Sequence, residues 1–343
     1  MTAIGAVIYL RAPIMTNDSV ELPPVELLQL LADGKNHSGQ ELASALNVSR
    51  TAIWKQLAKL EGLGLELLSQ SGKGYCLVGG LELLEKNVIS ACLAPSAANA
   101  ITGFVLLKSI DSTNSYLMRQ EPAVGVSVCF AELQTAGRGR RGRQWVSPFA
   151  SNIYLSLRLS INGGLGAFEG ISLAVGVAVA RALHELGVVD IQLKWPNDVL
   201  WSGKKLGGIL IEVVGDPSGV CHLVVGLGLN LKTEKSMSSA IDQPWIALDK
   251  ILPVLPNRNK VAACLLNHIV PLLNNYEVEG FSSYKSEWES LNAHANQLVD
   301  LYVGLVRLSG LMRGVNAVGA LLLETDKGVE VFHGGEVSLR ASG

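Results

Sequence analysis

Hydrophobic residues recur with a helical period in the first patterned part of the chain. An amphipathic run over residues 25–32 stops at Gly34, a residue type that commonly terminates helices. Ser38 and Glu41 then form a capping box, in which each side chain satisfies a free backbone donor. The pattern therefore predicts two short helices joined by a turn, the second over residues 41–46.

A third helix is predicted from residue 50 to about 62, capped by Ser49, and residues 49–60 hold three positive charges and no acid. Strands over 65–70 and 74–78 follow and form a hairpin. This order of elements is typical of a winged helix-turn-helix, whose basic helix enters the major groove of DNA. The residues expected to contact DNA are Ser49, Arg50, Thr51, Lys55, Lys59 and Lys73. The alternative is a three-helix accessory domain whose cations are only solvated.

After residue 80 the pattern changes to an alternation of strands and helices. Apolar runs predict strands at residues 104–108, 126–133, 153–159, 191–194, 206–214 and 222–229. Helices are predicted at residues 113–119, 169–186 and from 260 to about 291. Residues 293–343 divide into five short strands separated by glycine turns. We therefore predict an α+β protein with a winged helix-turn-helix at 20–80, a mixed-sheet domain at 81–291 and a small β domain at 292–343.

Composition and charge limit the possible classes of function. The chain of 343 residues is 48 % apolar with a mean hydropathy of +0.31, which excludes a disordered protein. Its net charge is −2, so any nucleic-acid surface must be local. Five scattered cysteines and six histidines show neither disulfide nor metal-ligand spacing, and no metal site is expected. We find no membrane span and no convincing signal peptide, whether translation starts at Met1 or Met15, so we expect a cytoplasmic protein.

Polar side chains gather at the ends of predicted strands in the central domain. Residues 111–114 lie at a strand-to-helix junction, where they can cap the helix or bind a small polar ligand. Residues 134–145 hold four arginines interleaved with three glycines, a composition that neither a helix nor a strand favours. Such an arginine loop can close around an anion, because guanidinium and backbone N–H groups both bind phosphate oxygens. An RGG-like nucleic-acid segment and a merely solvated loop are the alternatives.

Two further clusters follow in the same domain. Lys194 opens a Lys-Trp-Pro-Asn-Asp turn at the end of a strand, where a lysine aimed into a cleft would hold an anion. Glycines gather in residues 203–208 and 226–230, which indicates a close approach of the backbone to a ligand. Neither segment has the spacing of a P-loop.

Taken together and in order, these motifs are specific. The segments Ser112-Thr-Asn, Gln134 with the arginine loop, Lys194-Trp-Pro-Asn-Asp, Lys205-Leu-Gly-Gly and Gly226-Leu-Gly-Leu-Asn resemble the biotin–protein ligases. From about residue 23 to its end, the chain is similar to the bifunctional ligases that also repress the biotin operon. The resemblance implies a central domain of the biotin/lipoate ligase type and a small SH3-like barrel at the carboxyl end.

The resemblance also implies roles for individual residues. The positions that match biotin contacts are Ser112, Thr113, Asn114, Gln134, Arg138, Gly139, Arg140 and Lys194. Of these, Lys194, Arg138 and Arg140 would be the catalytic cations, because charge accumulates on phosphate oxygens as biotin attacks the α-phosphate of ATP. Weaker matches near the nucleotide are Asn230, Glu336 and Arg340. Mg²⁺ is expected on the ATP phosphates rather than in a protein cage.

The implied function is an ATP-dependent ligase that forms biotinyl-5′-AMP and transfers biotin to a lysine of a carrier protein. The implied partners are the biotin carboxyl carrier protein of acetyl-CoA carboxylase, operator DNA, and a second copy of the chain when biotinyl-AMP is bound; no membrane is expected. One alternative is a lipoate–protein ligase, which usually lacks the winged helix and the arginine loop. The other is a ligand-sensing transcriptional regulator with an inactive ligase domain, against which the intact arginine loop and Lys194 argue.

Overall fold

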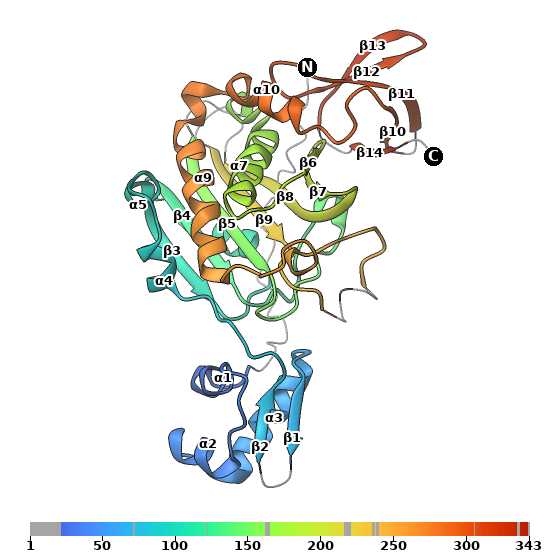
Figure 1. Cartoon of the computed structure of the whole chain (residues 1–343). Coiled ribbons are helices and arrows are strands. Elements are labelled where there is room, and N and C mark those ends of the chain that lie inside the picture. Colours follow the sequence, from blue (N-terminus) through green and yellow to red (C-terminus); the bar gives the residue numbers. More distant parts are fainter. Residues whose placement is uncertain are drawn as a thin grey trace.

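Three regions follow one another along the chain in the computed structural model (Figure 1). The structure describes residues 22–70, 73–121, 123–161, 165–215, 221–234, 237, 240–304, 306–334 and 337–341. Helices and a hairpin lie at one end, a large sheet with its helices lies in the middle, and a second sheet lies at the other end (Figure 1). The α+β class and the order of the three regions are therefore confirmed.

The amino-terminal region is a small helical domain with a wing. Its elements are α1 (Val25–Leu31), α2 (Gly39–Ala45), α3 (Arg50–Gly62), β1 (Leu67–Gln70) and β2 (Gly74–Leu77), the two strands being antiparallel. The capping box is present, since Ser38 Oγ accepts from the Glu41 N–H at 3.1 Å and Glu41 Oε2 accepts from the Ser38 N–H at 2.8 Å. The first strand begins at Leu67 rather than at residue 65, because the residue 65 N–H still bonds to the Leu60 carbonyl at the end of α3.

The central domain is built on a seven-stranded mixed sheet in the order β3-β4-β5-β9-β8-β7-β6. The strands are β3 (Ile101–Leu107), β4 (Val126–Ala131), β5 (Ile153–Ile161), β6 (Ile191–Lys194), β7 (Asp198–Trp201), β8 (Lys204–Gly215) and β9 (Cys221–Leu229). β3 and β4 run parallel, whereas the other neighbours are antiparallel. The predicted mixed sheet is thus confirmed.

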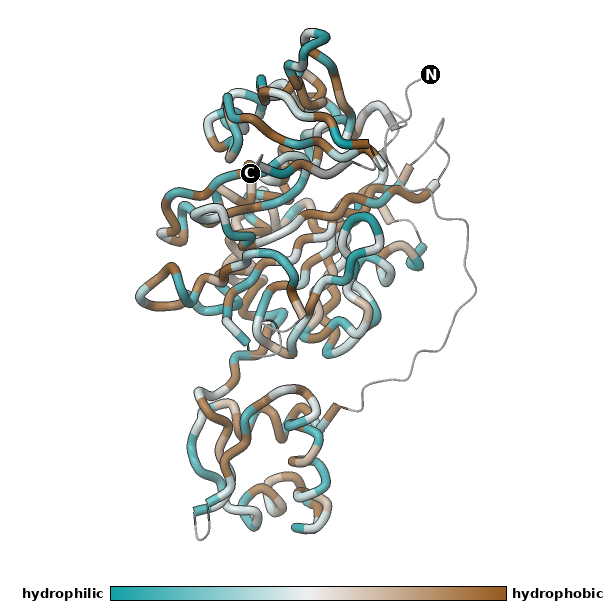
Figure 2. Tube along the Cα trace, turned by 90° about the vertical axis from the view of Figure 1, so that its right-hand side faces the viewer, coloured by the Kyte–Doolittle hydropathy of each residue, from teal (hydrophilic) through white to brown (hydrophobic). Residues whose placement is uncertain are grey.

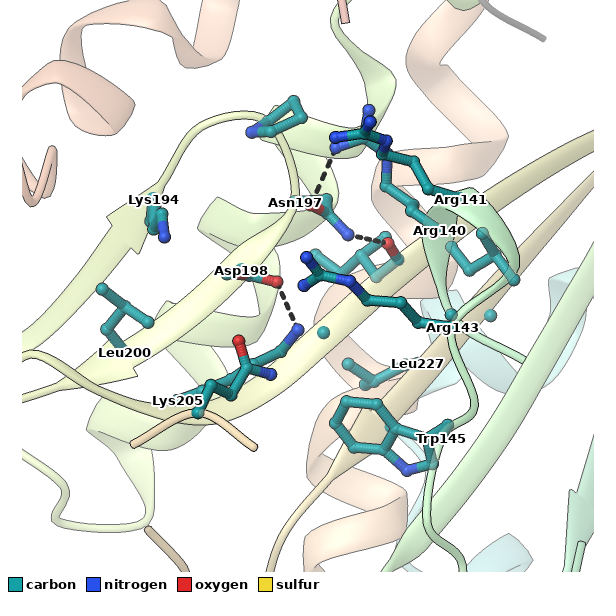
Figure 3. Close-up of a pocket in the computed structure, with 18 of the residues that line it drawn as sticks. Arg140, Arg141, Arg143, Trp145, Lys194, Asn197, Asp198, Leu200, Lys205 and Leu227 are labelled. Carbon is teal, nitrogen blue, oxygen red and sulfur yellow. Dashed lines mark hydrogen bonds and ion pairs between the residues drawn. The ribbon is translucent and has the colours of Figure 1, made fainter. Parts of the chain in front are cut away.

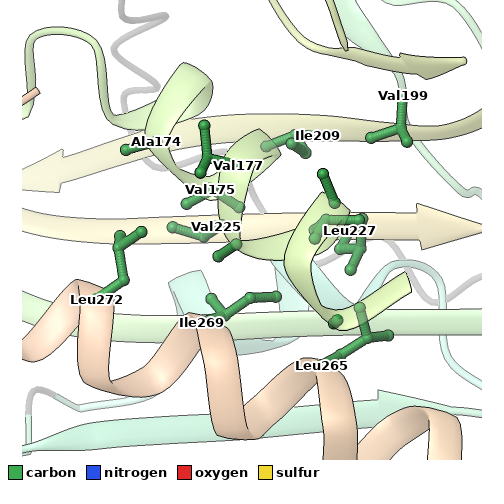
Figure 4. Packing of buried hydrophobic residues seen from close by; sticks show 14 of the residues in the cluster. Ala174, Val175, Val177, Val199, Ile209, Val225, Leu227, Leu265, Ile269 and Leu272 are labelled. Carbon is green, nitrogen blue, oxygen red and sulfur yellow. The ribbon is translucent and has the colours of Figure 1, made fainter. Parts of the chain in front are cut away.

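Two long helices, α7 (Ile171–Glu185) and α9 (Arg258–Glu279), cover one face of this sheet (Figure 1). Their apolar residues pack with Val225 and Leu227 of β9 in one buried core (Figure 4). Burying one such aliphatic side chain contributes about 1.5–3 kcal/mol, so this layer is the main source of stability. Shorter helices complete the domain: α4 (Lys86–Ala91), α5 (Pro95–Ala100), α6 (Thr113–Arg119) and α10 (Ser282–Ser290).

The structure corrects the predicted helices in two places. The single helix expected from residue 260 to about 291 is in fact α9 and α10, because Gly280 with φ 58° ends the first of them. The helix expected from residue 169 begins at Ile171, because Gly170 adopts a left-handed φ of 71°.

No helix or strand was predicted at the positions of β7, α4 and α5. Strand β7 follows the Lys-Trp-Pro-Asn-Asp turn directly, and Lys194 of β6 pairs with Asp198 across it. Helices α4 and α5 are six residues each, less than two turns, which is too short for a helical period to show in the sequence.

The carboxyl-terminal region is a five-stranded antiparallel sheet in the order β13-β12-β11-β10-β14. Its strands are β10 (Leu298–Val303), β11 (Val306–Val315), β12 (Leu321–Thr325), β13 (Gly328–Phe332) and β14 (Val337–Ala341), which confirms the predicted five. The Trp195 Nε1–H donates to the Gly319 carbonyl at 3.1 Å and joins this sheet to the central domain.

The amino-terminal domain packs directly on the central domain. Phe149 and Ala150 are buried in the same apolar cluster as the leucines of α1 and α3. Arg258 and Glu132 form a buried ion pair 2.8 Å apart, with side chains 0 % and 2 % exposed. Glu132 also accepts the Leu84 N–H, so the segment that links the two domains bonds to this pair. Among the residues that the structure describes, no helix is long and apolar enough to cross a membrane.

Candidate active site

A cavity of about 760 Å³ opens between the arginine loop, the central sheet and the carboxyl-terminal domain (Figure 3). The predicted residues that line it are Ser112, Thr113, Asn114, Gln134, Arg138, Gly139, Arg140, Lys194 and Arg340. Asn230 does not line it; its Nδ2 donates to the Ile246 carbonyl at 3.2 Å and supports the segment beside the cavity. Glu336 lies outside the described residues.

One end of the cavity is a buried polar pocket at the start of α6. Thr113 donates from its N–H and from Oγ1 to Gln134 Oε1, at 2.9 and 3.1 Å. Gln134 Nε2 donates to Ser147 Oγ at 3.1 Å, and Ser156 Oγ donates to Thr113 Oγ1 at 2.7 Å. Ser112 is the amino-terminal cap of α6. Because these side chains bond to one another away from solvent, the pocket keeps its shape before a ligand arrives.

Glu212 of β8 joins this pocket to the arginine loop. Its Oε2 accepts from Asn114 Nδ2 at 2.8 Å and from Arg138 Nη2 at 2.9 Å, and its side chain is only 5 % exposed. A buried carboxylate requires such partners. Gly226 gives Asn114 its space, since a Cβ there would lie 2.4 Å from Asn114 Oδ1. Glu212 was not among the predicted site residues, although an acid inside an otherwise apolar strand is a signal that the sequence offers.

The arginine loop crosses the mouth of the cavity in a compact turn. The Gly139 N–H donates to the Arg143 carbonyl at 2.7 Å, and Arg141 adopts a left-handed φ of 56°. Arg140 donates to Asn197 Oδ1 at 3.2 Å (Figure 3). It also donates to the Gly334 carbonyl. The loop is therefore held both by the turn after β6 and by the carboxyl-terminal domain.

Lys194 is a half-buried cation among other cations. Desolvation lowers its pKa from the ordinary value, Asp198 opposes this, and Lys205, Arg340 and Arg143 add to the lowering. Asp198 is itself engaged by Lys205, with Nζ and Oδ1 2.7 Å apart (Figure 3). An anion placed beside Lys194 would therefore relieve an excess of positive charge.

Trp145 forms a flat wall of the cavity that the sequence analysis did not select as a site residue. A Cβ at Gly228 would lie 2.3 Å from Trp145 Cε2, so the ring packs directly on the backbone of β9. Lys205 Nζ lies 5.5 Å from the ring centroid. The paired glycines at 226 and 228 explain the glycine cluster, because they allow Asn114 and Trp145 to approach the sheet.

The arrangement favours a ligand with a neutral polar head and a polyanionic tail. Seven cationic side chains line the cavity: Arg138, Arg140, Arg141, Arg143, Lys194, Lys205 and Arg340. Guanidinium and ammonium groups at this density bind phosphate oxygens. Within the described residues, one group of three side chains has metal-ligand spacing, Glu185, Cys264 and His268, and none of them lines the cavity. The expectation of no metal site remains a prediction.

The predicted DNA-contacting residues are exposed or half-buried on α3, its cap and the wing. Ser49, Arg50, Thr51 and Lys55 are exposed on α3 or its cap, Lys59 is half-buried, and Lys73 is exposed at the tip of the wing. Ser49 Oγ accepts the Ala52 N–H at 3.1 Å, so the cap fixes the first turn of the helix.

Known proteins resemble this chain in all three of its regions. Three family models match the chain: the biotin/lipoate A/B protein ligase family at residues 106–230, an HTH domain at 26–76 and the biotin protein ligase C-terminal domain at 307–340. The Bifunctional ligase/repressor BirA of Escherichia coli is 38 % identical over 93 % of this chain and 98 % of that protein. A relative of that name from Bacillus subtilis is 29 % identical over 92 % of this chain and 98 % of its own length.

Among solved structures, the biotin protein ligase from Aquifex aeolicus in complex with biotin and ATP aligns with a TM-score of 0.60. It is 29 % identical and covers 70 % of this chain and all of its own. The chain therefore belongs to the biotin/lipoate A/B protein ligase family, and within it to the bifunctional ligase/repressors.

Proposed function

We propose that this chain activates biotin with ATP, transfers it to a lysine of an acceptor protein, and represses transcription. The observation that carries the ligase function is one cavity with a buried neutral polar pocket at one end and cations at the other. Biotin has a neutral ureido head and a carboxylate tail, and ATP is a polyanion, so the two ends match the two substrates. The similar Aquifex aeolicus protein holds both biotin and ATP.

The polar pocket suits the ureido head of biotin. That group presents two N–H donors and one carbonyl acceptor, and Ser112, Thr113, Asn114 and Gln134 offer hydroxyl and amide partners for them. Lipoic acid has no polar group at the corresponding end, so it would leave those buried partners unpaired at a cost of about 1–3 kcal/mol each. This favours biotin over lipoate.

In the first step a carboxylate oxygen of biotin attacks the α-phosphorus of ATP, the bond to the β-phosphate oxygen breaks, and pyrophosphate leaves. Lys194 and the loop arginines stabilise the charge on the phosphate oxygens, and Glu212 keeps Arg138 oriented. Mg²⁺ bound to the ATP phosphates would neutralise part of that charge.

In the second step the amine of the acceptor lysine attacks the biotinyl carbonyl. An amide forms, AMP leaves with the bonding electrons, and the amine gives up a proton. The arginine loop, which crosses the mouth of the cavity, shields the reactive anhydride from water between the two steps.

The proposed partners follow from the domains. We propose the biotin carboxyl carrier protein of acetyl-CoA carboxylase as acceptor, a cytoplasmic location, and operator DNA bound by a homodimer that forms when biotinyl-AMP is present. A single winged helix neutralises few phosphates, so two copies on a palindrome are needed for useful affinity. The proposed domain limits are 20–80, 81–291 and 292–343.

Biotin-dependent exchange of labelled pyrophosphate into ATP tests the ligase function. Exchange with biotin and none with lipoate is expected. Exchange with lipoate alone would identify a lipoate ligase, and no exchange with either would identify a regulator with an inactive ligase domain.

Sedimentation with and without biotin plus ATP tests the regulatory function. We expect a dimer and tight binding to the DNA upstream of the chain's own gene only when the adenylate can form. Linkage then requires the dimer to bind adenylate more tightly than the monomer does. Equal dimerisation and equal DNA affinity in both states would contradict the repressor proposal and leave the ligase proposal intact.

A further inference from the structure

The recognition helix α3 exposes a tryptophan that folding does not explain. Trp54 is 63 % exposed, and among the described residues it is the one aromatic side chain in the set of exposed large hydrophobic residues. The other five tryptophans of the chain are buried or half-buried. Indole is among the most costly groups to leave in water, so a side chain held out in this way indicates a binding surface.

Trp54 stands in the middle of the basic face of α3. Residues four apart on a helix lie in one row, so Arg50 precedes Trp54 by one turn, and Thr51 and Lys55 form the neighbouring row. The buried stripe of Ile53, Leu57 and Leu60 lies about a quarter of a turn away from Trp54 around the helix. The indole is thus flanked by cations that would contact phosphates, and charge complementarity selects DNA over an apolar partner as the occupant of this face.

We infer that Trp54 reads sequence by packing its indole ring on thymine methyl groups in the major groove. This inference rests on the proposed repressor function. The thymine C5-methyl is the one apolar group that base edges present in the major groove, and a recognition helix brings its first turns to those edges. Arg50 and Lys55 would then position the helix on the backbone, while Trp54 contributes base discrimination.

The test uses the full chain with biotin and ATP and a DNA duplex selected by the wild type from a random pool. Each thymine is replaced in turn by deoxyuridine, which removes only the methyl group. At one or more positions this replacement should weaken wild-type binding about fivefold or more, the lower end of the range for losing a base contact. The Trp54→Ala variant should bind the unmodified duplex with a similar loss of affinity. Deoxyuridine at those same positions should then cause no further loss in this variant.

Two matched variants separate this role from others. Lys55→Ala should weaken binding to selected and random duplexes alike and reduce the salt dependence, whereas Trp54→Ala should leave random-duplex binding and the salt slope unchanged. Val124→Ala, which removes a 90 % exposed apolar residue far from the helix in sequence, should change neither measurement. Circular dichroism checks that each variant folds.

Several outcomes would overturn the inference. If the loss of affinity caused by Trp54→Ala adds to the loss caused by deoxyuridine at every thymine, no methyl group contacts the indole. A change in self-association of Trp54→Ala in the absence of DNA would assign the face to a second copy of the chain. If the wild type selects no duplex at all, the repressor function itself fails, and the inference fails with it.

Discussion

The polar pocket around Thr113 and the arginine loop line the same cavity but are held in different ways. In the pocket, Thr113 and Asn114 are 4 % and 3 % exposed and bond to side chains from two strands and a loop. Arg141 and Arg143 of the loop are exposed, and Arg140 makes its side-chain contacts across to other segments. The pocket is therefore preorganised for binding, whereas the loop depends on a few contacts that can break and re-form.

The largest effect is expected from Lys194→Ala, in the cationic part of the cavity beside the arginine loop. Removing a cation from a dry site should lower the rate of adenylate formation about 10²–10³-fold. Biotin-dependent pyrophosphate exchange measures this rate. A near-normal rate in a folded variant would exclude Lys194 from catalysis.

Gly226→Ala should disable the pocket without touching a charged group. The new Cβ would lie 2.4 Å from Asn114 Oδ1, and overpacking of this kind costs about 1–3 kcal/mol. We expect a rise in the KM for biotin of about 5- to 150-fold, with the KM for ATP much less affected. Gly166→Ala is the control, because a Cβ there meets nothing within 4 Å.

Glu212→Gln tests the connection between pocket and loop. The amide keeps the shape of the side chain but replaces a charge-assisted bond to Arg138 with a neutral one, a loss of about 1–2 kcal/mol. Biotin affinity by calorimetry should fall roughly tenfold. Unchanged affinity would show that Arg138 is oriented by other contacts.

Arg140→Gly should weaken the closure of the loop more than the chemistry. The variant loses the bonds to Asn197 and Gly334, so adenylate should leave the cavity and label lysines of bystander proteins. Turnover should fall less than about tenfold, since the other cations of the cavity remain in place. If labelling of bystander proteins at equal turnover matches that of the wild type, the loop does not retain the adenylate.

The smallest effect concerns stability and pH. The pKa of Lys194 is lower in the folded chain than in the unfolded chain, where the side chain has its ordinary value. Between these two pKa values the unfolded chain binds more protons than the folded chain. The free energy of unfolding therefore rises with pH across this range. Lys194→Met should therefore be more stable than the wild type at pH 7, with an advantage that shrinks as the pH approaches the ordinary lysine pKa. Thermal unfolding from pH 6 to 10 measures it; a constant difference would contradict this account.

Local signals were enough to predict much of this protein. The capping box of Ser38 and Glu41, the cap at Ser49 and the apolar stripe of α3 depend on residues within one or two turns of each other, so their consequences are visible in the sequence. The same is true of helix α6 at Thr113–Arg119 and of the strands whose apolar residues face the core. Residues that line the cavity were predicted where they form a compact motif, as in the arginine loop.

Tertiary structure alone decided which distant residues meet. Glu212 became part of the site because β8 brings it within bonding distance of Asn114, 98 positions earlier in the sequence. Trp145 became a wall because Gly228 of β9 leaves room for its ring. The helix that the hydrophobic period predicted as continuous ends at Gly280. Asn230 does not line the cavity and bonds to a neighbouring segment instead. Sequence patterns express contacts between near neighbours, whereas an active site is made by side chains that only the folded sheet brings within bonding distance.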